Sequence, residues 1–238
     1  MENSRMSRGW AVPIQPAAAA ERVTDFLRKV YGWMCAGLGI TALVAFEVAG
    51  SPAILSHLVS NQFLYLGLIL AELALVFYLS ARAERLAPGT ATALFGLYAA
   101  LNGVTLSFVL LAYTGQSVAD AFVVTAGMFG AMALFGSTTK RSLAGVGQFV
   151  FMGLIGLVLA SLVGLFWHNN ALQFVISVVG VIVFTGLTAW DAQRLKQMAL
   201  AIPEGQAGSL AIVGALSLYL NFMNLFLSLL TLFGNRRE

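Results

Sequence analysis

The stretch GALSLYLNFMNLFLSLLTLFG (214–234) is apolar along its whole length except for one regular series of small and polar residues. The series recurs at steps of three and four, which places its members on one face of an α-helix. Lipid offers no hydrogen-bond partners to such a face. The pattern therefore predicts a membrane-spanning helix that packs against several neighbours near the middle of a bundle. The series consists of Gly214, Ser217, Asn221, Asn224 and Ser228.

The composition of the whole chain indicates that its main solvent is lipid. Hydrophobic residues make up 59% of the 238 residues and charged residues only 10%, against about 45–50% and about 25% in ordinary soluble domains. So few charges exclude a typical soluble enzyme, a coiled coil and a disordered protein. The formal net charge of +3 is too small and too scattered for a nucleic-acid-binding protein. The single cysteine, Cys35, excludes a disulfide framework within one chain.

Seven apolar segments are candidates for membrane-spanning helices, each of which needs about 20 apolar residues. All five prolines fall outside these segments. Proline interrupts helices, so its positions agree with the segment boundaries that hydropathy gives. The expected fold is an all-α integral membrane protein, a seven-transmembrane-helix bundle with the C-terminal helix central. We expect residues 1–29 to form a cytoplasmic N-terminal tail and residues 30–238 to form the membrane domain. The segments are 30–49, 63–81, 90–112, 121–135, 146–167, 171–190 and 211–233.

The basic residues predict the orientation of the chain in the membrane. Eleven of the 13 lysines and arginines lie in the N-terminal tail or in the connections after the second, fourth and sixth segments, and the other three connections have none. Basic loops stay on the cytoplasmic side. The N-terminus is therefore expected in the cytoplasm. Seven spans place the C-terminus, with Arg236 and Arg237, outside; a re-entrant last segment is the alternative.

Polar residues at membrane depth are the candidates for function, because a charge at the bilayer centre costs roughly 2.5–3.5 kcal/mol and is usually partnered or functional. Asp191 closes the apolar run 171–190, and Glu72 lies near the middle of the segment 63–81. Asn102 shares one face of the segment 90–112 with Tyr98 and Thr105. These residues predict polar contacts inside the bundle.

Structural roles are the alternatives for the same residues. Asp191 can be an interfacial residue paired with Arg194 or Lys196 on its own helix, and Glu72 a protonated, hydrogen-bonded acid. Asn224 and its polar neighbours on the last segment can serve as hydrogen-bonding groups that hold helices together. Spacing alone leaves these alternatives open.

Several membrane enzymes and receptors are excluded by the positions of the reactive residues. The three lysines lie at segment ends, so a retinal Schiff base within a span is excluded. His57 and His168 lie in outer connections, away from any serine nucleophile within a span, and two histidines without a third ligand make a weak metal site. An aspartyl protease needs two carboxylates that share one site, but Asn221 occupies the second position. We expect no enzyme and no cofactor.

Five stretches resemble the Bax inhibitor-1 family, and the basic tail with PAAAAERV (16–23) resembles its bacterial branch. They are GLTAWDAQRLKQM (186–198), GALSLYLNFMNLFLSLLTLFG (214–234), LYAALNGVTLSFVL (97–110), FGSTTKRSL (135–143) and FMGLIGLVLASLVGLFW (151–167). The resemblance covers most of the chain from the first segment onward, and the two C-terminal motifs are specific in combination. It implies a seven-helix bundle with a central last helix, in the bacterial inner membrane.

The resemblance also implies a calcium leak that responds to pH. In the family, an aspartate in the motif 186–198 pairs with an aspartate in the last segment; Asp191 matches the first, whereas Asn221 occupies the second position. The pair Asp191 and Asn221 is thus the expected pore and pH-sensing site and a possible calcium contact. Glu72 followed by Arg82 and Arg85 is similar to an acid in the second segment of the family and the basic residues at its cytoplasmic end, and Asn102 and Asn224 are expected as supporting polar residues.

Asn221 changes the chemistry that the resemblance implies. Two carboxylates in contact titrate as a coupled pair, and one carboxylate with an amide cannot. The amide keeps an oxygen ligand for a hard cation but lacks the negative charge that calcium favours. The pore can therefore persist while its pH switch is weakened or lost.

Two other functions stay open. The alternative to the leak is a non-conducting membrane interaction protein that modulates a membrane-anchored protease or other quality-control machinery. A proton-coupled transporter is the third possibility.

The first testable prediction concerns orientation. A cysteine placed at position 2 in a Cys35→Ser background should resist membrane-impermeant thiol reagents in intact cells, because the basic connections hold that end in the cytoplasm. It should react once the membrane is permeabilised. Labelling of intact cells from outside would reverse the proposed orientation.

Overall fold

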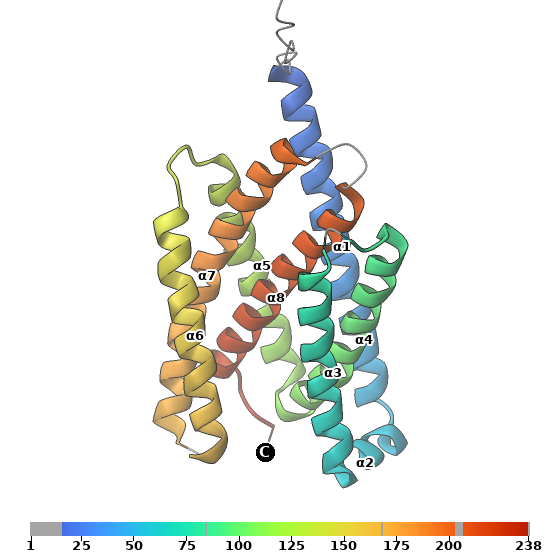
Figure 1. Ribbon diagram of the computed structural model, residues 1–238. Coiled ribbons are helices and arrows are strands. Elements are labelled where there is room, and N and C mark those ends of the chain that lie inside the picture. The colour runs from blue at the N-terminus through green and yellow to red at the C-terminus, as the bar shows by residue number, and fades with distance from the viewer. Residues whose placement is uncertain (1–15, 84, 168, 203–206, 238) are drawn as a thin grey trace, which may run out of the picture.

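The computed structural model describes residues 16–83, 85–167, 169–202 and 207–237, which form a bundle of antiparallel helices (Figure 1). Each long helix runs opposite to the one before it along the chain. The described residues form eight helices: α1 (Pro16–Ala49), α2 (Pro52–Ser60), α3 (Gln62–Ala81), α4 (Pro88–Ala112), α5 (Gly115–Thr138), α6 (Ala144–Phe166), α7 (Asn170–Ala201) and α8 (Ala207–Phe233).

Six of these helices are long and apolar enough to cross a membrane, and α3 contributes a shorter apolar stretch over Leu66–Ala81. The protein is therefore an integral membrane helical bundle, and each of the seven expected segments corresponds to one helix. The short helix α2 lies in the connection between α1 and α3 and begins with a proline at its first position, where the missing N–H has no cost.

Three helices extend six or more residues beyond the segments that the sequence predicts. Helix α1 begins at Pro16, so residues 16–29, expected within the tail, are its first turns; the alanines after Pro16 are strong helix formers. Helix α5 starts at Gly115 because the side chain of Thr114 caps it by accepting from the Ser117 N–H. Helix α7 continues past Asp191 to Ala201.

Helix α8 lies at the centre of the bundle. Of the residues in its most apolar 18-residue window, 67% are buried, against 17–33% for the other five long helices. It packs against α1, α4 and α3 on one side and against α5 and α7 on the other, while α6 covers α7 from outside (Figure 1). The described structure thus consists of two groups of helices that enclose α8, as the polar series on its sequence predicts.

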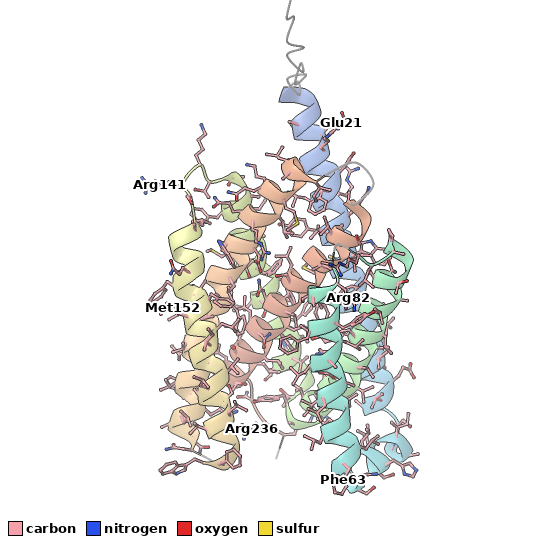
Figure 2. All side chains as sticks on the ribbon, in the orientation of Figure 1. Glu21, Phe63, Arg82, Arg141, Met152 and Arg236 are labelled. Carbon is pink, nitrogen blue, oxygen red and sulfur yellow. The ribbon has the colours of Figure 1, made fainter. Side chains whose placement is uncertain are left out.

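Large apolar side chains point outward around the bundle, as Figure 2 illustrates for Met152 and Phe63. Phe46, Phe149 and Ile182 are likewise more than half exposed. In water, such a surface would be unfavourable by roughly 25 cal/mol for each Å² of apolar area. The outer face of this bundle is therefore a surface for lipid tails.

The basic residues gather at one end of the bundle. The α3–α4 turn, the α5–α6 turn and the C-terminal end of α7 lie at the end from which α1 projects (Figure 1). Arg82 and Arg141 lie toward this end, whereas Arg236 lies at the opposite end (Figure 2). The fold thus keeps the separation of charge along the membrane normal that underlies the predicted orientation.

The chain end is tied to the α4–α5 turn by backbone hydrogen bonds. The Thr114 N–H donates to the Asn235 carbonyl, and the Arg237 N–H donates to the Ala112 carbonyl, both at 3.0 Å. The Asn235 N–H donates to Ser117 Oγ at 2.9 Å. These bonds hold residues 234–237 across the turn, with Arg236 over the Tyr113 ring.

A glycine sets the closest approach of α5 to α7. A Cβ at Gly136 would collide with the backbone of Ala189, including its carbonyl oxygen. The absence of a side chain therefore allows the two backbones to touch. This contact holds α7 in position two residues before Asp191.

We expect Gly136→Ala to destabilise the protein by about 1–3 kcal/mol, the usual cost of overpacking. Gly130→Ala on the same helix is the matched control, because a Cβ there meets no atom within 4 Å. Thermal unfolding of the purified variants in detergent measures both effects. Equal unfolding temperatures for the two variants would contradict the close contact.

Candidate functional site

The carboxylate of Asp191 is buried between α7 and α8, with 5% of the residue exposed. Ser217 Oγ donates to its Oδ2 at 2.7 Å, and Asn221 Nδ2 donates to the same oxygen at 2.8 Å. The structure therefore brings together the two residues that the sequence proposes as a pair. The described residues place no hydrogen-bond donor on Oδ1.

The contact exists because Ser217 and Asn221 lie one helical turn apart on the face of α8 that meets α7. A turn earlier on this face, a Cβ at Gly214 would come within 2.6 Å of Leu195 Cδ2. Further along α8, Ser228 lies against Gly180 of α7. A Cβ added to Gly180 would be 2.5 Å from the Oγ of Ser228. Small residues at both ends of the contact thus allow α7 and α8 to approach closely.

The basic residues near Asp191 on α7 have other partners, so the intrahelical ion pair is not formed. The Arg194 guanidinium lies over the Trp190 ring, 5.7 Å from its centroid. Lys196 Nζ donates to the Ser137 carbonyl at the end of α5, at 2.7 Å. Asp191 is held by uncharged donors instead.

The rest of the polar series on α8 does not form hydrogen bonds between helices. Asn224 Nδ2 donates to the Leu220 carbonyl at 2.8 Å, and Ser228 Oγ donates to the Asn224 carbonyl at 2.7 Å. Both bonds stay within α8. The alternative in which these residues join helices by hydrogen bonds therefore applies to Ser217 and not to Asn224 or Ser228.

A second polar cluster lies on the other side of α8, among α1, α3 and α4. Thr105 Oγ1 donates to Glu72 Oε1 at 2.6 Å, and Asn102 lies near the same carboxylate. Tyr219 on α8, which is fully buried, donates to Asn102 Oδ1 at 3.1 Å. Its hydroxyl is 2.6 Å from Thr41 Oγ1 on α1. One chain of polar contacts thus links four helices.

Arg82 does not belong to this cluster. It caps the end of α3, and its guanidinium lies 5.9 Å from the centroid of the Tyr78 ring. Ten residues separate it from Glu72, which is about 15 Å along a helix. The structure therefore brings Asn102 to Glu72 but leaves Arg82 at the basic end.

Gln193 is a site residue that the sequence does not single out. It is buried, its Oε1 accepts from the Leu143 N–H at 2.8 Å, and its Nε2 donates to the Arg141 carbonyl at 2.9 Å. The side chain thereby fixes the α5–α6 turn against α7. The sequence shows that Gln193 is a polar residue between Asp191 and Lys196, but helical spacing does not reveal a hydrogen-bond partner fifty residues away.

The donor set around Asp191 does not resemble a resident metal site. Within the described ranges, no group of three or more His, Cys, Asp or Glu residues could hold a metal ion. Asp191 and Asn221 offer carboxylate and amide oxygens, whereas bound calcium takes 6–8 oxygen ligands. The arrangement suits a proton or a passing, partly hydrated cation. His57 lies on the exposed helix α2, and His168 lies outside the described residues.

Comparison with known proteins matches nearly the whole chain. A family model described as "Inhibitor of apoptosis-promoting Bax1" matches residues 23–238. The Escherichia coli K12 protein named "Inner membrane protein YbhL" is 51% identical over 227 residues, covering 94% of this chain and 96% of that one. A Deinococcus radiodurans protein is 46% identical over 219 residues, covering 92% and 93%. A Borreliella burgdorferi protein is 41% identical over 215 residues, covering 90% and 93%.

We expect Gln193→Ala to destabilise the protein by about 1–3 kcal/mol, because it leaves the buried N–H of Leu143 and the part-buried carbonyl of Arg141 without their partner. Gln197→Ala is the control: it removes the same side chain from an exposed position one turn along α7. Unfolding in detergent, followed by circular dichroism, compares the two. An equally small effect of both substitutions would show that Gln193 does not hold the turn.

Proposed function

The chain belongs to the Bax inhibitor-1 family of membrane proteins, and we propose that it is a calcium leak of the bacterial inner membrane whose conductance responds to pH. The observation that carries the proposal is the buried carboxylate of Asp191 in the centre of the bundle, held by Ser217 and Asn221. An ionisable group at this depth marks an ion or proton pathway by default. The inner-membrane location is supported by the name of the E. coli relative.

The geometry supports a pathway for cations along the α7–α8 contact. Asp191 supplies the negative charge, with Oδ1 clear of hydrogen-bond donors from the described residues, and the amide of Asn221 supplies a neutral oxygen on the same face. Calcium is a hard cation that prefers such oxygen ligands. Because the site offers few of them, a cation would pass through in partly hydrated form and would not be stored.

The amide at position 221 favours a conductance that depends less on pH than it would with aspartates at both positions. Its Nδ2 donates to Asp191 Oδ2, so the residue beside the carboxylate is an uncharged amide that does not itself titrate. Two aspartates at these positions would instead share a proton and release it in a coupled step. The present site has one titrating group, and Glu72 in the second cluster is the next candidate.

A membrane interaction protein without conductance is the second candidate function, and the projecting part of α1 favours it. The first turns of α1 extend beyond the rest of the bundle at the basic end (Figure 1), with Arg22 and Arg28 exposed. This helix end is a surface on which a membrane-anchored protease or quality-control partner could bind. A co-purifying partner together with an absence of calcium flux would favour this function.

Proton-coupled transport is the third candidate function. A proton-coupled transporter would accumulate a solute against its gradient when a proton gradient is imposed. A passive leak only lets calcium run down its own gradient. Flux into vesicles that contain the purified protein alone separates the two, because no other protein is present to supply the driving force.

The decisive test compares calcium flux into proteoliposomes from pH 5 to pH 8 for three proteins. We expect a shallow pH profile for the wild type, a steeper one for Asn221→Asp, which restores two carboxylates in contact, and the loss of the remaining titration at this site for Asp191→Asn. Identical profiles for the wild type and Asn221→Asp would show that the pair is not the switch. No flux from any of the three would favour the interaction protein.

A further inference from the structure

A cavity of about 830 Å³ opens between α6, α7 and α8 at the end of the molecule that carries the C-terminus. Its lining runs from Trp167 and Asn169 at the α6–α7 turn inward to Phe184 and Asn224. None of its lining residues belongs to the Asp191 contact or to the Glu72 cluster. The cavity is therefore a separate feature of the described structure.

The two walls of this cavity differ in character. The wall from α6 is mostly apolar, with Leu154, Leu157 and Leu162 among its residues. The wall from α7 and α8 carries amide and hydroxyl groups on successive turns, and Arg236 lies at the mouth. The polar residues of that wall are Asn170, Gln173, Ser177, Asn224, Ser228 and Thr231.

We propose that this cavity is a water-filled vestibule through which small ions from the C-terminal face reach the Asp191–Asn221 contact, and that Arg236 controls which charge enters. The ion pathway rests on the proposed function, whereas the water content of the cavity does not. The volume would hold on the order of 25 water molecules at about 30 Å³ each.

Water fits the polar wall better than a lipid tail does. The three hydroxyls of Ser177, Ser228 and Thr231 donate to carbonyls of their own helices, but Asn224 uses only one N–H in its bond to Leu220. A primary amide has a second N–H and a carbonyl oxygen to satisfy. A lipid tail would leave these groups without partners, at a cost of several kcal/mol for each group.

The inner end of the cavity lies one helical turn from the candidate site. Asn224 lines the cavity, and Asn221 lies three residues earlier on the same face of α8, a rise of about 4.5 Å. Phe184 of α7 closes the inner end from the opposite side, with 9% of the residue exposed. The polar face of α8 is thus continuous from the vestibule to the oxygen of Asp191.

Arg236 gives the mouth of the vestibule a positive charge. It is exposed, lies over the ring of Tyr113, and the lining contains no carboxylate among the described residues. A positive charge lowers the local concentration of cations and raises that of anions. Arg236 therefore acts as a brake on cation entry from this face.

Thiol accessibility tests the water content directly. In a Cys35→Ser background, Ser228→Cys places a thiol in the vestibule, and Val179→Cys places one on the outer face of α7, beside Gly180, at the same depth. The probes are the anionic sulfonatoethyl and the cationic trimethylammonioethyl methanethiosulfonates. Each forms a disulfide with the thiolate and releases methanesulfinate. Thr231→Cys replaces Ser228→Cys if the latter does not reach the membrane.

We expect the anionic probe to label Ser228→Cys roughly tenfold faster than Val179→Cys, because the reactive thiolate forms only in contact with water. Relative to each probe's rate with a free thiol in solution, the anionic probe should also react about two- to fivefold faster with Ser228→Cys than the cationic probe, and Arg236→Gln should remove this preference. Equal, slow labelling at both positions would overturn the vestibule and indicate lipid in the cavity. An unchanged charge preference in Arg236→Gln would overturn the role of Arg236.

Calcium flux then separates this inference from the proposed function. Modified Ser228→Cys should lose most of its calcium flux, and unmodified Arg236→Gln should show increased flux from the C-terminal face. Rapid labelling with flux unaffected by modification would overturn the connection between vestibule and site. Rapid labelling in a protein without any flux would refute the calcium leak and the ion pathway while it confirms the water-filled cavity.

Discussion

The arrangement of this bundle depends on the need to keep the polar face of α8 away from lipid. Ser217 and Asn221 would each lack a partner in the bilayer core, and the carboxylate of Asp191 would be far more costly there. Placing α8 in the middle, against α7, solves both problems with two hydrogen bonds to one oxygen. The remaining helices then cover α8 and present apolar side chains to the lipid.

The sequence predicted the features that depend on local pattern. Hydropathy and prolines located all seven apolar segments, and the spacing of the polar series placed α8 at the centre. Helix ends were less predictable, because Thr114 extends α5 by a cap that hydropathy does not register. The partners of Gln193 and Lys196 were not predictable either, since both side chains bond to backbone groups of the α5–α6 turn or the end of α5, fifty or more residues away.

Some contacts of the candidate site could likewise be predicted from the sequence, and others could not. The contact between Asp191 and Asn221 was expected from a family resemblance and required α7 to continue beyond the apolar run, which it does. Asn102 and Glu72 share one cluster, whereas Arg82 lies at the far end of α3. A list of polar residues therefore indicates which helices have inward faces, but only the packing of α1, α3, α4 and α8 decides which of those residues touch.

The bond between the chain end and the α4–α5 turn has a mechanical consequence. Helices α4 and α5 belong to opposite groups around α8, and the segment after α8 is hydrogen-bonded to the connection between them. At the basic end, the two groups meet through side-chain packing of α1 on α7, which can slide more easily than backbone hydrogen bonds can break. The two groups of helices are thus fixed to each other most firmly at the C-terminal end, so that a motion that separates them would be largest at the basic end.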